Sequence, residues 1–154
     1  MFLFHKKSTI YSPCEGEFKS LHEVKDEVFS KELMGKGFAV VPTNGDIHSP
    51  VDGKVTMVFP TKHAIGITDK NNIEYILHIG IDTVQLKGTG FQISVHEGDS
   101  VKAGDLLVNC DLAMLKQAGY QTDVLVIVTN HKDVRIKQAG NLKVKDEIAY
   151  CENI

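Results

Sequence analysis

The amino-acid sequence predicts an all-β protein, folded as one antiparallel β-sandwich or barrel with little helix. Short runs rich in Val, Ile, Phe and Tyr recur along the chain, and Gly, Pro and Asp residues separate them. Many short strands with closely spaced turns are typical of sandwiches and barrels. A chain of 154 residues is long enough to bury a core, and no linker or low-complexity segment divides it. We therefore expect residues 1–154 to form a single domain.

The predicted elements follow one another in chain order. The first eight residues are expected to be a flexible segment, whose apolar stretch Phe2-Leu3-Phe4 is too short for a signal peptide or a membrane span. A weak contact of this stretch with a membrane surface is an alternative. One helix is expected over residues 112–118, with Asp111 as its N-cap and Gly119 as its stop. The expected strands are residues 38–41, 54–59, 63–68, 73–78, 106–110 and 124–129.

A weak internal similarity links two turn-then-strand segments. Residues 12–18 and residues 49–55 both begin with Ser-Pro and continue through a glycine to an apolar residue. Both patterns favour a turn followed by a strand.

Charge and cysteine content narrow the function and the compartment. The formal net charge of -3 argues against nucleic acid as the main partner. Cys14, Cys110 and Cys151 are odd in number and form no Cys-x-x-Cys motif, which argues against a disulfide framework and a zinc knuckle. Reduced cysteines are usual in the cytosol, so we expect a cytoplasmic protein.

Two histidines lie in neighbouring predicted strands. The cluster Asp69-Lys70-Asn71-Asn72 favours a four-residue hairpin loop between the strands 63–68 and 73–78. If Thr68 faces Ile73, paired residue numbers sum to 141, and His63 lies opposite His78. Their Cβ atoms would then be ~5 Å apart on one face of the sheet. The prediction depends on register, because a slip of one residue would send the two side chains to opposite faces.

Two converging imidazoles favour phosphoryl chemistry. One ring nitrogen attacks phosphorus while the other ring donates a hydrogen bond to the phosphoryl oxygens, and both forms are accessible because histidine titrates near pH ~6.5. The alternative is that both are ordinary strand-end histidines, bonded to backbone or water. The pairing of two on one patch weakens that alternative without removing it.

The segment 75–91, which contains His78-Ile79-Gly80-Ile81-Asp82, resembles the active-site signature of the glucose-type enzyme IIA family of the bacterial phosphoenolpyruvate sugar phosphotransferase system. The resemblance implies a phosphoryl carrier with the duplicated hybrid motif fold. It also implies that neither a metal nor an organic cofactor is required. Further resembling segments follow in the same order along the chain: residues 35–42, 50–53, 61–64 and 97–105.

The resemblance implies a role for each site residue. His78 would accept a phosphoryl group from the histidine-containing phosphocarrier protein and pass it to a cysteine on the IIB domain of a sugar permease. His63 would bond the phosphoryl oxygens, and Thr61 would orient His63 through its hydroxyl. Asp82 would have a supporting role, or would only bond its own backbone in a turn. The chain would meet the membrane only through the permease, and it could have regulatory protein targets.

An apolar surface around the histidines is also implied. Phe29 and Phe59 match positions that ring the site in the family, so we expect them at the surface although core packing is the ordinary fate of phenylalanine. Val28, Leu33 and Met34 would join them as partner-binding residues.

The sequence departs from the family pattern at a few positions. Asn72 stands where glycine is usual, but asparagine tolerates the left-handed turn. Lys36 and Thr89 stand where acidic residues are common, which alters the local charge.

Two other functions remain open at this stage. The first is a zinc endopeptidase of the duplicated hybrid motif fold, in which His63 and His78 would be zinc ligands. The seven histidines, at 5, 22, 48, 63, 78, 96 and 131, contain no His-x-His to complete such a shell. The second is a biotinyl or lipoyl carrier domain, with Lys70 at a hairpin tip as the attachment site.

Overall fold

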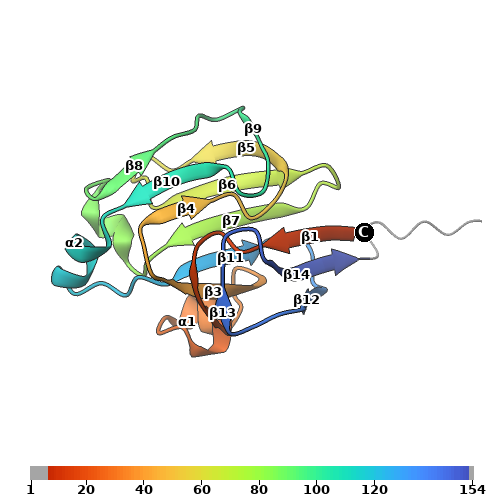
Figure 1. Cartoon of the computed structure of the whole chain (residues 1–154), viewed down its shortest axis with the longest axis horizontal. Helices are drawn as coiled ribbons and strands as arrows, with labels where there is room; N and C mark the ends of the chain where they lie inside the picture. The colour runs from red at the N-terminus through yellow and green to blue at the C-terminus, as the bar shows by residue number, and fades with distance from the viewer. Residues whose placement is uncertain (1–6, 153–154) are drawn as a thin grey trace, which may run out of the picture.

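The computed structural model describes residues 7–152, and in this part every strand pairing is antiparallel (Figure 1). One large sheet has the order β13-β2-β3-β11-β7-β6-β5-β9, and two three-stranded sheets have the orders β1-β14-β12 and β4-β10-β8. The predicted all-β antiparallel class is confirmed.

The strands are β1 (Lys7–Tyr11), β2 (Gly16–Lys19), β3 (Lys36–Pro42), β4 (Asp46–His48), β5 (Gly53–Val58), β6 (Ala64–Asp69), β7 (Glu74–Ile79), β8 (Phe91–Ile93), β9 (Ser100–Val101), β10 (Leu106–Cys110), β11 (Val124–Val128), β12 (Val134–Ile136), β13 (Asn141–Leu142) and β14 (Glu147–Glu152).

The helical elements are short. The predicted helix is confirmed as α2 (Leu112–Gln117), because the Asp111 side chain accepts a hydrogen bond from the N–H of Met114 and Gly119 follows with a φ of 88°. Three short elements were not predicted from the sequence: α1 (Glu27–Ser30) and the 3₁₀ turns η1 (Leu21–Glu23) and η2 (Thr83–Leu86).

Residues 1–8 were predicted to be a flexible segment, and this was wrong for the last two of them. Lys7 and Ser8 already belong to β1 and pair with Glu152 and Cys151 of β14. The apolar stretch Phe2-Leu3-Phe4 lies outside the described residues.

The middle of the large sheet is buried on both faces. In β11, Val124, Val126 and Val128 belong to the main core, while Leu125 and Ile127 belong to a smaller cluster on the other face. A strand covered on both sides is expected to read as a continuous apolar run, as β11 does. The smaller cluster is covered by residues 20–34, which we call the cover segment and which contain η1 and α1 (Figure 1).

The internal similarity corresponds to a structural duplication. The N–H of Ser12 donates to the carbonyl of Asp146, and the N–H of Ser49 donates to the carbonyl of Asp105, each over 2.8 Å. In both copies the residue before the aspartate donates its own N–H back to the serine carbonyl. Each Ser-Pro turn is therefore fixed by a distant segment of the chain.

The hairpin between β6 and β7 has a different register from the predicted one. Asp69 closes the loop with Ile73, so the loop has three residues, and Ala64 rather than His63 lies opposite His78. The Asp69 carboxylate explains the shorter loop, because it accepts hydrogen bonds from the N–H groups of Asn71 and Ile73. Asn72 takes the left-handed position with a φ of 62°. A three-residue loop that ends in a left-handed residue is a common hairpin type.

The left-handed conformation of Asn72 predicts how the hairpin responds to substitution. Asn72→Val should lower the free energy of unfolding by about 1–2 kcal/mol, because a β-branched residue is strained there, whereas Asn72→Gly should retain wild-type stability. Urea unfolding of the three proteins measures this. Equal stability of the valine and glycine variants would contradict it.

Candidate functional site

The rings of His63 and His78 meet on the covered side of the large sheet. Their centroids are 4.9 Å apart and the ring planes are nearly perpendicular, at 84°. His78 lies near the end of β7, between β6 and β11. The prediction that the two imidazoles converge is therefore correct, although the predicted register is wrong.

The loop between β5 and β6 explains how the rings meet in spite of the register. Phe59 and Ala64 close this loop, since the N–H of Phe59 donates to the carbonyl of Ala64. His63 is thus a loop residue that just precedes β6, and it does not follow the alternation of the strand. Lys62, immediately before it, has a φ of 62°, which side chains rarely adopt. This left-handed residue turns the chain so that the His63 ring reaches His78.

Thr61 lies against one ring nitrogen of His63. Its hydroxyl lies 2.7 Å from Nδ1 of His63. When the hydroxyl donates to Nδ1 of the neutral ring, the proton of that ring is on Nε2. His63 then presents a donor on Nε2. This contact agrees with the predicted orienting role of Thr61.

Both imidazoles favour the neutral form. The pKa of His78 is lowered to about 4, first by burial and then by the neighbouring His63, while the Gly80 backbone and the Asp26 carboxylate act in the opposite direction. Burial also lowers the pKa of His63. At neutral pH both rings are therefore uncharged, and His78 has a free electron pair for attack.

The two nitrogens of His78 have different surroundings. Nδ1 is buried and makes no full hydrogen bond to any residue in the range 7–152. The Gly80 backbone raises the pKa of the ring, against the effect of burial. With the proton on Nδ1, the electron pair would be on Nε2.

Phe29 and Phe59 lie beside the two histidines, but Phe29 is not at the surface as predicted. The ring centroid of Phe29 is 4.9 Å from that of His78, and Phe59 is 5.7 Å from His63. Phe29 is only 6% exposed, so its expected place at the surface is wrong: the residue packs in the small cluster beneath the cover segment. Phe59 is half-buried.

The other predicted partner-binding residues are at the surface. Val28, Leu33 and Met34 expose 43%, 70% and 40% of their area. All three belong to the cover segment, and Leu33 and Met34 line a shallow hollow beside Lys36. Val28 is adjacent to Phe29 in the sequence, and Leu33 and Met34 follow Phe29 within five residues.

In the described part of the chain, the Asp82 side chain forms no hydrogen bond to either histidine ring. It is exposed, adopts a φ of 62° just before η2, and makes no capping hydrogen bond with its side chain. The carboxylate that acts on His78 is that of Asp26, which also caps α1 by accepting from the N–H of Val28. Sequence reasoning missed Asp26, although an aspartate two residues before an apolar residue is a helix-start signal.

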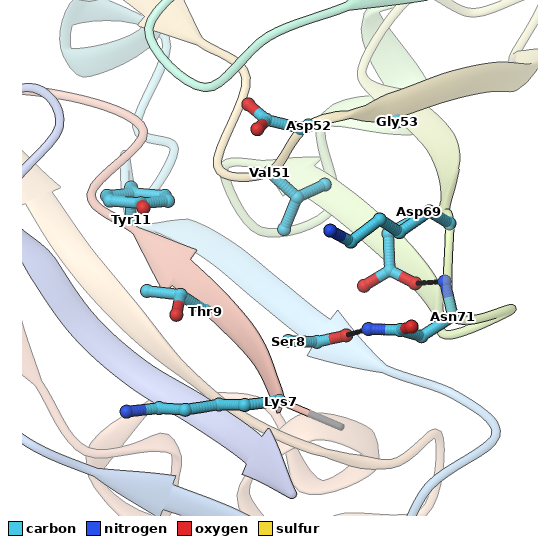
Figure 2. A pocket seen from close by; sticks show the side chains of 10 residues that line it. Lys7, Ser8, Thr9, Tyr11, Val51, Asp52, Gly53, Asp69 and Asn71 are labelled. Atoms are coloured by element: carbon cyan, nitrogen blue, oxygen red, sulfur yellow. Dashed lines mark hydrogen bonds between the residues drawn. The ribbon is translucent and has the colours of Figure 1, made fainter. Parts of the chain in front are cut away.

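A separate hollow of about 340 Å³ lies at the other end of β6, between β1 and the β6–β7 hairpin (Figure 2). Its carboxylate, Asp69, is already bonded to Asn71, Ile73 and the hydroxyl of Tyr75. This hollow is not part of the histidine site, because Asp69 and Ala64 are the opposite ends of one strand.

Residues 7–152 show neither a cluster of metal ligands nor a membrane-spanning helix. No group of three or more His, Cys, Asp or Glu side chains there is arranged to hold a metal ion. No helix in this range is both long and apolar enough to cross a membrane.

The strained backbone of Lys62 predicts an effect on both histidines. Lys62→Val should cost about 1–2 kcal/mol of unfolding free energy and shift the imidazole NMR signals of His63 and His78. Lys62→Asn, of similar size but tolerant of a positive φ, should leave both nearly unchanged. Lys70→Val, at an exposed lysine of the next hairpin, is the control. Identical spectra for the valine and asparagine variants would show that Lys62 does not place His63.

The lowered pKa of His78 predicts a pH dependence of stability. Below pH 6.5 the unfolded chain binds a proton at this histidine while the folded protein does not, so stability falls as the pH drops towards 4. Wild type should lose about 2 kcal/mol more between pH 7 and pH 5 than His78→Gln does. His96→Gln, at an exposed histidine, should behave as wild type. Parallel curves for wild type and His78→Gln would contradict the buried, neutral imidazole.

Comparisons with known proteins identify the family. The model of the phosphoenolpyruvate-dependent sugar phosphotransferase system EIIA 1 family matches residues 8–134. The solved glucose permease IIA from Mycoplasma capricolum superposes with a TM-score of 0.89 at 42% identity, covering 97% of this chain and 99% of that one.

Two longer relatives contain a region similar to this chain. The glucose-specific EIICBA component of Streptococcus pneumoniae is 46% identical over 146 residues, which are 93% of this chain and 20% of that protein. The β-glucoside-specific EIIBCA component of Bacillus subtilis is 48% identical over 145 residues, with coverage of 92% and 24%. The chain thus spans a quarter or less of these two relatives. Neither the zinc endopeptidase nor the biotinyl or lipoyl carrier is supported by these matches. The chain belongs to the EIIA 1 family of the phosphoenolpyruvate-dependent sugar phosphotransferase system.

Proposed function

We propose that this chain is a IIA phosphoryl carrier, which accepts a phosphoryl group on His78 from the histidine-containing phosphocarrier protein. It then passes the group to a cysteine on the IIB domain of a glucose-type permease. The observation that carries the proposal is the perpendicular contact of the His78 and His63 rings, with Thr61 bonded to the second ring. The 154 residues are proposed to act as one cytoplasmic IIA domain.

In the first step, Nε2 of neutral His78 attacks the phosphorus atom of the donor phosphohistidine. A new N–P bond forms, the donor's N–P bond breaks, and its electron pair returns to the donor imidazole. The low pKa of His78 matters here, because a protonated ring would have no free pair on Nε2. The proton on Nδ1 stays next to the Gly80 backbone.

His63 stabilises the transferred group. With Nδ1 bonded to the Thr61 hydroxyl, its Nε2–H is free to donate to a phosphoryl oxygen on His78. Phosphoryl transfer needs positioned donors more than covalent help from the protein, since charge is spread over the moving oxygens. A donor fixed in advance has this effect without reorganisation at the moment of transfer.

The apolar surroundings limit loss of the group to water. Phe29 packs on one ring and Phe59 on the other, so water has little access from either side. In the second step the IIB cysteine thiolate attacks phosphorus, the S–P bond forms, and the N–P bond to His78 breaks.

Docking of both partners is assigned to the exposed part of the cover segment. Val28, Leu33 and Met34 expose apolar area on the segment that carries Phe29, and apolar area is expected at the centre of a protein interface. The names of the two longer relatives combine EIIA with EIIB and EIIC in one chain, which supports a IIB domain as the acceptor. A regulatory protein target would use the same surface.

Phosphorylation with purified components tests the proposal. With phosphoenolpyruvate, enzyme I and the phosphocarrier, wild type should take up one acid-labile phosphate, and His78→Ala should take up none. Undiminished labelling of His78→Ala would overturn the assignment of the nucleophile. Circular dichroism of the variant checks that the fold is retained.

The two histidines should fail differently. His63→Gln, which keeps an amide donor, should still accept phosphate but pass it to the IIB cysteine more slowly. His63→Ala should be slower still, by roughly 10²–10³ relative to wild type, because a preorganised donor to the moving oxygens is lost. Onward transfer is measured in a single turnover from purified phosphoprotein. A wild-type rate for His63→Ala would show that His63 takes no part in the transfer.

A further inference from the structure

One row of paired residues crosses the large sheet and contains His78. Lys19 of β2 lies opposite Ala39 of β3, Ala39 opposite Leu125 of β11, and Leu125 opposite His78 of β7. Directly paired residues point to the same face of a sheet. Lys19 therefore lies on the same covered face as the candidate nucleophile, with Ala39 and Leu125 between them.

Lys19 makes the most buried ion pair found between residues 7 and 152. Its Nζ is 3.0 Å from Oδ2 of Asp123, and the two side chains are 19% and 5% exposed. Both side chains of every other ion pair in this range are exposed by 29% or more. Asp123 is two residues before Leu125, so its side chain is on the same face. Burial of two charges is unfavourable unless they remain paired.

The pair connects the two parts of the protein that hold His78. On one side, the carbonyl of Asp123 accepts the N–H of Gly80 over 2.7 Å, and the carbonyl of Gln121 accepts the N–H of Ile81. These bonds fix the turn that follows His78. On the other side, Lys19 immediately precedes the cover segment, which places Phe29 on the His78 ring.

An apolar cluster fills the space between these two attachments. It consists of Leu21, Val24, Phe29, Ala39, Ile81, Leu125 and Ile127. Apolar packing is not directional, so the cluster alone does not fix where the cover segment begins. A short ion pair at the start of the segment supplies that direction.

We propose that the Lys19–Asp123 ion pair positions His78, by holding the start of the cover segment against Asp123, whose carbonyl binds the turn at Gly80 that follows β7. This inference rests on the proposed function and deepens it. Among the described residues, neither side chain forms a hydrogen bond to a histidine ring, so we treat both as positioning residues that act through Phe29 and Gly80. When the pair is broken, the cover segment and its phenylalanine move relative to the ring.

The stability of the fold and the position of His78 should respond differently when the ion pair is replaced. Replacement of a buried ion pair by apolar residues of similar size often preserves or raises stability, whereas removal of one partner leaves an uncompensated charge. A double variant, Lys19→Met with Asp123→Leu, should therefore fold with a wild-type melting temperature. It should nevertheless lack the directional contact that fixes the position of the cover segment.

The experiment compares this double variant with Lys19→Met, Asp123→Asn and Lys19→Arg. Lys137→Met, which removes a lysine from an exposed ion pair in another sheet, is the matched control. Two quantities are measured on each protein: the single-turnover rate of transfer from His78 to IIB, and the pKa of His78 by NMR titration without phosphate.

The double variant and both single variants should transfer phosphate roughly ten- to a hundredfold more slowly. In the same proteins the pKa of His78 should rise from about 4 towards 6.5, since the ring gains water. Lys19→Arg, which keeps the charge, and Lys137→Met should match wild type in both measurements.

A wild-type rate and pKa in the double variant would overturn the inference, and would leave the pair a purely structural role. If a single variant fails to fold, the double variant decides. If wild type takes up no phosphate, the proposed function fails, while the titration still tests whether the pair positions the ring.

Discussion

The burial of one imidazole between two strands and a covering segment is the constraint on which the rest of the site depends. His78 could be placed at an exposed strand end, but there it would be protonated through much of the acidic range and open to water. In this protein β6 and β11 flank it within the sheet, and Phe29 lies on its ring. The proposed nucleophile is therefore neutral first because of burial and then because of the neighbouring His63. In the proposed transfer, the perpendicular contact with His63 supplies the donor to the phosphoryl group.

The two histidines are held by different kinds of structure, one by a regular strand and the other by an irregular loop. His78 belongs to the central strand pairings, whose residues are buried on both faces. His63, in contrast, belongs to a loop, and its direction comes from one left-handed lysine and from one threonine hydroxyl. Strain at such a position persists only where the surroundings hold it. The proposed donor can thus be adjusted by local backbone changes, while the half-buried His78 keeps its place in β7.

The sequence predicts the fold class and most of the site, and its errors have clear physical causes. Alternating and continuous apolar runs indicate strands well, and Asp111 with Gly119 bounds α2 correctly. The hairpin register was wrong because the Asp69 carboxylate draws two backbone N–H groups into a shorter loop, a contact that composition does not reveal. Phe29 was expected at the surface because it matches a position that rings the site in the family. The sequence pattern does not show that residues 20–34 fold over the sheet, where Phe29 packs. The effect of Asp26 on His78 also depends on that folding.

The duplicated Ser-Pro turns have a consequence for how the unit is built into longer chains. Ser12 is fixed by residues 145 and 146, and Lys7 lies opposite Glu152 in the β1–β14 ladder. Entry to and exit from the folded unit are thus adjacent. A tether attached at either end leaves from the same corner and pulls on the same pair of strands, neither of which carries a histidine of the site. The folded unit can therefore be joined to another domain through either end, with the histidine site facing the same way in both cases.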